Sequence, residues 1–275
     1  MFFSAIREGF SIPGLIIRSL RENAARKKSC VEIIRAYGGD KRQYVVFTGP
    51  ADGARQDKLV CYIHGGGWRN GNAKVFRFVG YFLARHGYAT VTAGYRLAPR
   101  YVFPCQADDV LAALACGLEI SQENGGPAGK IIMMGHSAGA QLAALTAMDH
   151  SVKKRVTDVV SISGPLNFDE CRNRYIKKLI SGFVPDRDAY DKANPIRRLS
   201  AAGKNGLPRF LCVHGDKDPV VEKENSISFV AKANEVDGGK AKLMMIKNGL
   251  HSNLIGLFFS DLPPVMEILR WMEQT

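Results

Sequence analysis

The pattern of apolar positions divides the chain into short strand-like runs and longer helical stretches. Short runs rich in β-branched and other apolar residues predict strands, which are residues 31–37, 43–47, 58–64, 89–95, 130–135, 156–163, 208–215 and 241–247. Apolar positions at helical spacing predict helices between several of these runs, over residues 74–86, 106–123, 138–148, 222–236 and 253–273. This alternation predicts an α/β fold whose eight-stranded, mostly parallel sheet carries helices on both faces. The first two strands are joined by a short polar link, so we expect that pair to be antiparallel.

The remaining segments predict one domain over residues 1–275 with a small helical cap. Residues 165–204 contain no strand pattern, and residues 1–30 have apolar positions close to helical spacing. We expect both segments to pack over the sheet as cap elements. No linker suggests a second domain.

The chain is basic, and its charge is uneven. Its 275 residues are 46% hydrophobic, enough for a large core, and its net charge is +12, with many of the basic residues in 1–30 and 165–204. Such charge can meet anionic lipid or acidic substrates. No nucleic-acid motif accompanies it, so we expect no nucleic-acid partner.

The Arg-rich start has three interpretations: helices packed on the domain, a mitochondrial presequence, or a peripheral helix on an anionic membrane. We favour the first. Charges interrupt every apolar run within residues 1–30, so the segment is neither a signal-peptide core nor a membrane span.

The six cysteines predict no metal site. They show no C-x-x-C spacing and no pairing with histidines, and the chain has no N-x-S/T acceptor. Both points favour a reducing compartment, and we expect a cytoplasmic protein without metal or cofactor.

A serine flanked by glycines is the strongest candidate for chemistry. The motif Gly-His-Ser-Ala-Gly, residues 135–139, follows the apolar run KIIMM and precedes the helical pattern AQLAALTA. A sharp strand-to-helix turn would display the Ser137 hydroxyl, and the glycines would let strand and helix approach each other. Such a serine becomes a nucleophile when a base removes its proton.

A glycine loop supplies candidate oxyanion donors. His64-Gly65-Gly66-Gly67-Trp68 follows the predicted strand at 58–64, and its backbone N–H groups could stabilise an oxyanion together with that of Ala138. A nucleotide-binding loop fits poorly, because no Gly-Lys-Ser/Thr follows and position 70 is Asn rather than Gly.

The last two predicted strands deliver a candidate acid and base. Asp216 and Asp218 both lie in HGDKDPVV, where either could orient a histidine, and His251 follows the final strand in NGLHSN. The order serine, acid, histidine along the chain is that expected of an α/β-hydrolase. His136 adjoins the serine, and we expect its side chain to diverge. For His64 we expect a structural hydrogen bond.

Taken together, these stretches resemble the α/β-hydrolase esterases and lipases related to hormone-sensitive lipase. The matching segments are HGGGW, YRLAPRYVFPCQADDVLAAL (95–114), GHSAGAQLAA, GDKDPVV and LHSN, over about residues 58–255. The resemblance implies Ser137 as nucleophile, Asp218 as acid and His251 as base. It also implies Gly66, Gly67 and Ala138 as oxyanion donors, and Gly65 belongs to the same loop as the two glycines. His136 stands where that group commonly has Asp, and GHSAG is more similar to arylformamidases.

We therefore predict a serine carboxylic-ester hydrolase that acts through an acyl-enzyme on small to medium acyl esters. The same residues would also serve an arylformamidase, which hydrolyses an N-formyl amide. A ligand-binding protein of this fold usually lacks a triad member, whereas this chain has all three. The basic cap further suggests a preference for esters that carry an acidic group.

Overall fold

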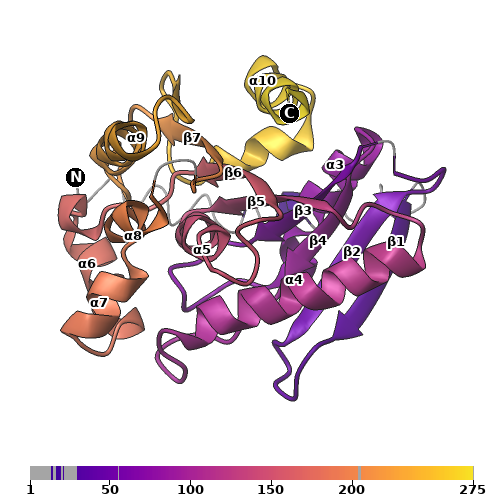
Figure 1. The fold of residues 1–275 in the computed structure, drawn as a ribbon, viewed down its shortest axis with the longest axis horizontal. Coiled ribbons are helices and arrows are strands. Elements are labelled where there is room, and N and C mark those ends of the chain that lie inside the picture. The colour runs from indigo at the N-terminus through magenta and orange to yellow at the C-terminus, as the bar shows by residue number, and fades with distance from the viewer. Residues whose placement is uncertain are drawn as a thin grey trace.

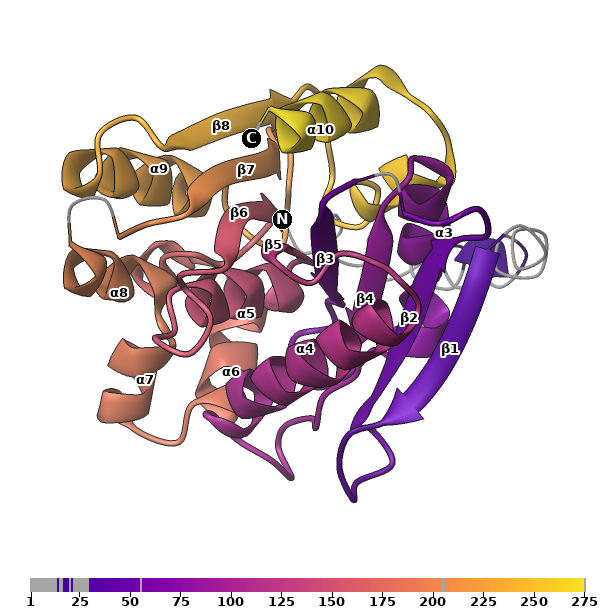
Figure 2. The same ribbon diagram turned by 45° about the vertical axis from the view of Figure 1, so that its right-hand side comes forward.

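In the computed structural model, residues 14, 17–19, 21, 30–54, 56–203 and 206–274 are described. Eight strands form one sheet in the order β1-β2-β4-β3-β5-β6-β7-β8 (Figures 1 and 2). Their bounds are β1 Cys30–Ala36, β2 Tyr44–Pro50, β3 Lys58–Ile63, β4 Ala89–Ala93, β5 Lys130–His136, β6 Val156–Ile162, β7 Arg209–Gly215 and β8 Ala241–Ile246. All eight predicted strands are present.

The sheet is mostly parallel, as predicted. β1 pairs antiparallel with β2 and β2 pairs antiparallel with β4, whereas each neighbouring pair from β4 to β8 is parallel. The carboxyl ends of those parallel strands therefore meet at one edge of the sheet, where α/β folds bind their ligands.

Helices cover both faces of the sheet. One face packs against α4 (Cys105–Glu123), α5 (Ala138–Ala147) and α9 (Glu224–Val236), and the other against α3 (Phe78–Arg85) and α10 (Pro263–Glu273). Along β3 the side chains alternate between the two faces. Leu59, Cys61 and Ile63 pack on the face covered by α4, α5 and α9, and Val60 and Tyr62 pack on the face covered by α3 and α10. Because both faces are covered, the central strands are buried along nearly their whole length and consist mostly of apolar residues.

Two predicted helices are wrong in extent. Residues 74–86 form α2 (Ala73–Phe76) and α3, interrupted at Arg77, whose ψ of −16° is shallower than the usual α-helical value. Residues 253–273 form the 3₁₀-helix η3 (Ile255–Phe259) and then α10. Pro263 and Pro264 lack the N–H that a helix interior requires, so α10 begins at them rather than passing through them.

Residues 165–204 form the short 3₁₀-helix η2 (Phe168–Glu170) and three helices, α6 (Arg174–Phe183), α7 (Arg187–Ala193) and α8 (Pro195–Ala202). These helices lie together at the end of the molecule opposite β1 (Figures 1 and 2). Most of residues 1–30 lie outside the described part of the chain. The predictions that this segment forms a cap element or contacts a membrane therefore concern residues outside the described ranges.

Candidate active site

Ser137 lies on a sharp turn between β5 and α5. Its φ of 55° and ψ of −124° fall in a region that residues with a Cβ atom rarely adopt. The Ser137 N–H donates to the carbonyl of Ile162 at 2.8 Å, and the Ser137 carbonyl accepts from the N–H of Ala140 at 2.9 Å. Bonds to the neighbouring strand and to the new helix therefore hold this strained residue in place.

The flanking glycines have no room for side chains. A Cβ atom on Gly135 would lie 2.3 Å from the carbonyl oxygen of Gly139, and one on Gly139 would lie 2.1 Å from that of Ile63. A Cβ atom on Gly65 would lie 2.8 Å from the carbonyl oxygen of His136. The turn is therefore packed backbone against backbone, which is the role predicted for glycine here.

The predicted serine, acid and base form a continuous hydrogen-bonded relay. The Oγ of Ser137 lies 2.9 Å from Nε2 of His251, and Nδ1 of His251 lies 2.8 Å from Oδ2 of Asp218. Asp218 follows β7 and His251 follows β8, so three strands deliver the relay to one edge of the sheet. Ser137 and His251 are only 6% and 7% exposed, which shields the relay from bulk water.

The Asp218 carboxylate is fully buried and fully bonded. Its Oδ1 accepts from the N–H groups of Val220 at 2.9 Å and Val221 at 3.0 Å. Burial raises its pKa, but the charge and hydrogen bond of His251, with smaller contributions from His214 and Val221, outweigh burial and lower the pKa to about 2. Asp216 instead donates its N–H to Ile246, and its Oδ1 is buried without a partner among the described residues.

The glycine loop lies beside Ser137 with its donors available. Gly66 and Gly67 have φ of +125° and +61°, which glycine adopts readily. Among the described turns and loops, no backbone hydrogen bond is donated by the N–H groups of Gly65, Gly66, Gly67 or Ala138. Free N–H groups beside a nucleophile are what a developing oxyanion requires.

Trp68 fixes this loop from within the core. Its side chain is fully buried and stacks on Phe183 at 4.5 Å between ring centroids. The indole N–H donates to Gln141 Oε1 at 2.9 Å, and Gln141 Nε2 donates to the carbonyl of Ala193 at 2.6 Å. The glycine loop, α5 and α7 are thereby bonded to one another.

His136 does not diverge from the site, so that prediction is wrong. Its Nε2 lies 3.0 Å from the carbonyl oxygen of His251 and must donate to it, and the two rings are 5.0 Å apart. Burial, aided by the charge of His251, lowers the pKa of His136 to about 3, so the ring is neutral near pH 7. The loop that carries His251 passes the end of β5, where its carbonyl meets His136. The spacing of residues in the sequence does not reveal this contact.

His214 supports the acid loop and was not anticipated. Its Nε2 lies 3.0 Å from the carbonyl oxygen of Val221 and 3.5 Å from the Asp218 carboxylate, and its Nδ1 lies 2.7 Å from Ser226 Oγ. Its position four residues before Asp218 was the only signal in the sequence.

Helix α6 spans two of the loops that form the site. At its start, Glu222 accepts from the N–H of Asn173 at 2.7 Å, and the Asn173 amide donates to the carbonyl of Pro219 at 2.8 Å. Further along, Leu179 lies so close to Gly67 that a Cβ atom there would be 2.6 Å away. One helix therefore contacts both the Asp218 loop and the glycine loop.

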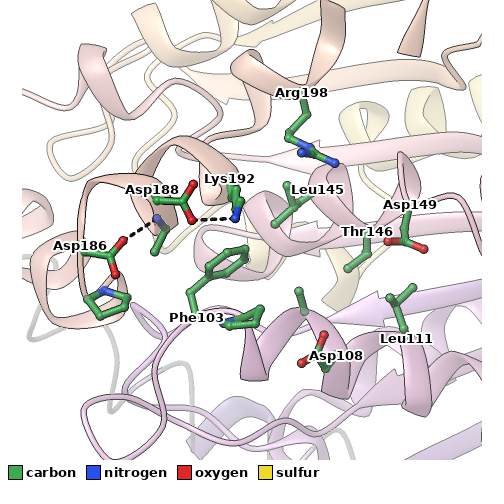
Figure 3. Close-up of a pocket in the computed structure, with 14 residues that line it drawn as sticks. Phe103, Asp108, Leu111, Leu145, Thr146, Asp149, Asp186, Asp188, Lys192 and Arg198 are labelled. Carbon is green, nitrogen blue, oxygen red and sulfur yellow. Dashed lines mark hydrogen bonds and ion pairs between the residues drawn. The ribbon is translucent and has the colours of Figure 1, made fainter. Parts of the chain in front are cut away.

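A cavity of about 400 Å³ lies between α7 and the helices α4 and α5 (Figure 3). Its lining includes apolar side chains, such as Phe103, Leu111 and Leu145, and charged ones, such as Asp186 and Arg198. Ser137 and His251 are not among its lining residues, so this cavity is separate from the relay.

Within the described ranges, no group of three or more His, Cys, Asp or Glu side chains is placed to hold a metal ion. Nor is any described helix long and apolar enough to cross a bilayer.

The sequence is similar to a known protein family and to several curated esterases. The BD-FAE family model matches residues 47–233. Esterase LipC of Mycobacterium tuberculosis is 26% identical over 214 residues, which cover 70% of this chain and 52% of LipC. The isoprenylcysteine α-carbonyl methylesterase ICME of Arabidopsis thaliana is 23% identical over 238 residues, which cover 79% of this chain and 56% of ICME. This chain thus spans about half of the length of these curated relatives.

Solved structures match over more of the chain. Esterase B from Lactobacillus rhamnosis has a TM-score of 0.76 at 19% identity, covering 98% of this chain and 94% of that one. A truncated carbohydrate esterase from gut microbiota has a TM-score of 0.74 at 19% identity, and the match covers 88% of this chain and 94% of the esterase. These likenesses confirm the predicted α/β-hydrolase fold.

Proposed function

Because the chain belongs to the BD-FAE family, we propose that it is a serine carboxylic-ester hydrolase. The observation that carries this proposal is the relay from Ser137 through His251 to Asp218, on a strained turn beside free backbone N–H groups. The relatives and structural neighbours described above are named esterases, which supports an ester substrate.

In the first half of the reaction, His251 Nε2 accepts the hydroxyl proton as Ser137 Oγ attacks the ester carbonyl. Asp218 holds His251 in the tautomer whose Nε2 is free to accept, and it stabilises the imidazolium that forms. The carbonyl oxygen becomes an oxyanion and receives hydrogen bonds from the backbone N–H groups of Gly66, Gly67 and Ala138.

The second half restores the enzyme. The oxyanion collapses, the ester C–O bond breaks, and His251 gives its proton to the departing alcohol, which leaves an acyl group on Ser137. Water then enters and gives a proton to His251 as its oxygen attacks the acyl carbon. Collapse of this second intermediate releases the carboxylic acid and returns the proton to Ser137.

We propose that residues 165–204 act as the cap that selects small to medium acyl groups, within one domain that includes residues 1–30. The contacts of α6 with both the acid loop and the glycine loop support this role. The exposed face of α6 carries Arg174, Lys177 and Lys178, and none of the three forms an ion pair with another described residue. We therefore expect faster hydrolysis of esters that bear a carboxylate than of neutral esters of equal length.

Salt tests this preference. Added salt should reduce the rate on the anionic ester and leave that on the neutral ester nearly unchanged, because screening weakens attraction between exposed charges. Equal salt dependence on the two esters would refute it.

We also propose a reducing, cytoplasmic location. All six cysteines are free in the structure, and four of them are buried, where a thiol serves as a small apolar side chain.

The decisive experiment measures hydrolysis of p-nitrophenyl esters from acetate to laurate by the wild type and Ser137→Ala. Loss of the nucleophile should reduce kcat on the order of 10⁶-fold. Ser200→Ala, which changes an exposed serine on α8, is the matched control and should retain wild-type rates.

Equal rates for the wild type and Ser137→Ala would contradict the proposal. If the wild type hydrolyses no ester but does hydrolyse N-formyl amides, the same relay serves an arylformamidase instead.

A further inference from the structure

A second cavity, of about 250 Å³, lies behind the glycine loop and has no part in the mechanism above. The hairpin between β1 and β2 lines it with Lys41 and Arg42, and His64 lines it from the end of β3. Its lining is mainly polar, and no carboxylate is among the described residues that form it.

The imidazole of His64 presents an unused hydrogen-bond acceptor. The residue is fully buried, and its ring stacks on Tyr95 at 4.4 Å between ring centroids. Nδ1 lies 2.8 Å from the carbonyl oxygen of Gly65, which can only accept, so Nδ1 carries the proton. Nε2 therefore holds a lone pair, and it is buried without a partner among the described residues. Burial lowers the pKa of His64 to about 4, which keeps the ring neutral near pH 7.

The other walls supply positive charge. Arg42 Nη1 donates to the carbonyl of Gly71 at 3.0 Å, and a guanidinium has further N–H groups to offer. Lys41 is exposed at the rim. The Tyr44 hydroxyl is occupied, because it donates to Asn72 Oδ1 at 2.6 Å. The cavity is thus lined by two cations and by His64, whose acceptor Nε2 is buried.

We propose that this cavity binds a small oxyanion that itself carries an O–H group, such as hydrogen phosphate or a hydroxycarboxylate. The anionic oxygens pair with Lys41 and Arg42, and the hydroxyl donates to Nε2 of His64. An anion without a proton leaves His64 Nε2 unpaired, and unpaired buried polar groups are costly, so it binds more weakly.

The site is linked to the candidate oxyanion donors. His64 bonds the carbonyl of Gly65 and Arg42 bonds that of Gly71, so groups that line the cavity hold both ends of the loop containing Gly66 and Gly67. A bound anion therefore restrains that loop.

Phosphate and sulfate provide a matched pair of probes. At mildly alkaline pH both are dianions of the same shape, but only phosphate retains a proton. Calorimetric titration of the full chain at constant ionic strength should give saturable phosphate binding, and sulfate binding at least about tenfold weaker, which corresponds to one lost hydrogen bond at a buried acceptor. Glycolate against acetate repeats the contrast for carboxylates and shows which anion class is preferred.

Variants locate the binding. Arg42→Gln should raise the phosphate Kd about tenfold or more, as expected for a charge-assisted hydrogen bond. Lys41→Gln changes an exposed side chain, so it should fold normally while also raising the Kd. Lys154→Gln, which removes an exposed cation from the turn before β6, is the charge-matched control and should bind as the wild type does.

Absence of saturable binding, equal binding of phosphate and sulfate, or unchanged binding by Lys41→Gln and Arg42→Gln would each overturn the proposal. Binding is measured without any ester, so its failure and the failure of the proposed hydrolysis are separate results.

Discussion

Two carboxylates in one loop have different surroundings, and the difference predicts different roles. Asp218 bonds His251 and two backbone N–H groups, whereas Asp216 bonds Ile246 through its main chain. Asp218→Asn should lower kcat about 10⁴-fold, because an amide no longer favours the His251 tautomer that accepts the Ser137 proton.

Asp216→Asn is the matched control, and kcat should stay within a few-fold of the wild type. The two variants are compared on one p-nitrophenyl ester, with circular dichroism to confirm that both fold. A large loss in Asp216→Asn alone would reverse the assignment.

For individual residues, the sequence predicted the members of the relay but not all of the side chains that contact them. The motif around Ser137 and the order of acid and base along the chain predicted the relay, and the resemblance to known esterases favoured Asp218 over Asp216 as its acid. The orientation of His136 and the support that His214 gives were not foreseen. The first depends on the loop that follows β8 and the second on the loop that follows β7, and no periodic pattern in the sequence encodes either contact.

Among the elements, the link between the glycine loop, α5 and α7 passes through one side chain, Gln141. Gln141→Leu leaves the buried Trp68 N–H and the Ala193 carbonyl unpaired. We expect the free energy of unfolding to fall by about 2 kcal/mol or more. A lower kcat should accompany this loss, because Trp68 fixes the glycine loop, whose N–H groups are the proposed oxyanion donors.

Urea denaturation and ester hydrolysis measure the two effects. Gln122→Leu, on the exposed side of α4, is the control and should change neither by much. If Gln141→Leu is as stable and as active as the control, the link does not position the loop.

Strands were predicted more accurately than helices. Strands β2 to β7 are buried along nearly their whole length, so their composition is distinctive. The pattern over residues 253–273 remained periodic through Pro263 and Pro264, and periodicity alone suggested one helix where the structure has two elements. The placement of α6 across the site depends on contacts with loops far away in the sequence, which no helical pattern specifies.

For the whole molecule, buried histidines determine the response to acid. Burial lowers the pKa of His64 to about 4 and of His136 to about 3, and it also lowers the pKa of His214. In the unfolded chain these groups titrate near 6.5. Between that pH and the folded pKa values the unfolded state binds more protons, so stability is complete above 6.5 and falls as the pH decreases.

Each such histidine contributes a slope of about 1.4 kcal/mol per pH unit. Unfolding near pH 5.5 should therefore take up about two protons from His64 and His136, and His214 adds to this uptake because burial lowers its pKa too. Calorimetry in buffers of different ionisation enthalpy measures the uptake. Asp218, with its lowered pKa of about 2, adds a further loss as the pH falls below about 4. Proton uptake near zero at pH 5.5 would contradict the buried, neutral state of these rings.

The order of strands in the sheet also has a consequence for the nascent chain. After β4, strands β5, β6, β7 and β8 are added one by one to the same growing edge, in the order in which the ribosome makes them. Ser137 and the glycine loop emerge early, but the acid and base arrive only with the last two strands. On the proposed mechanism, a growing chain cannot hydrolyse an ester until His251 has been made, and until β8 has been added it exposes an unpaired strand edge, the kind of surface that chaperones protect.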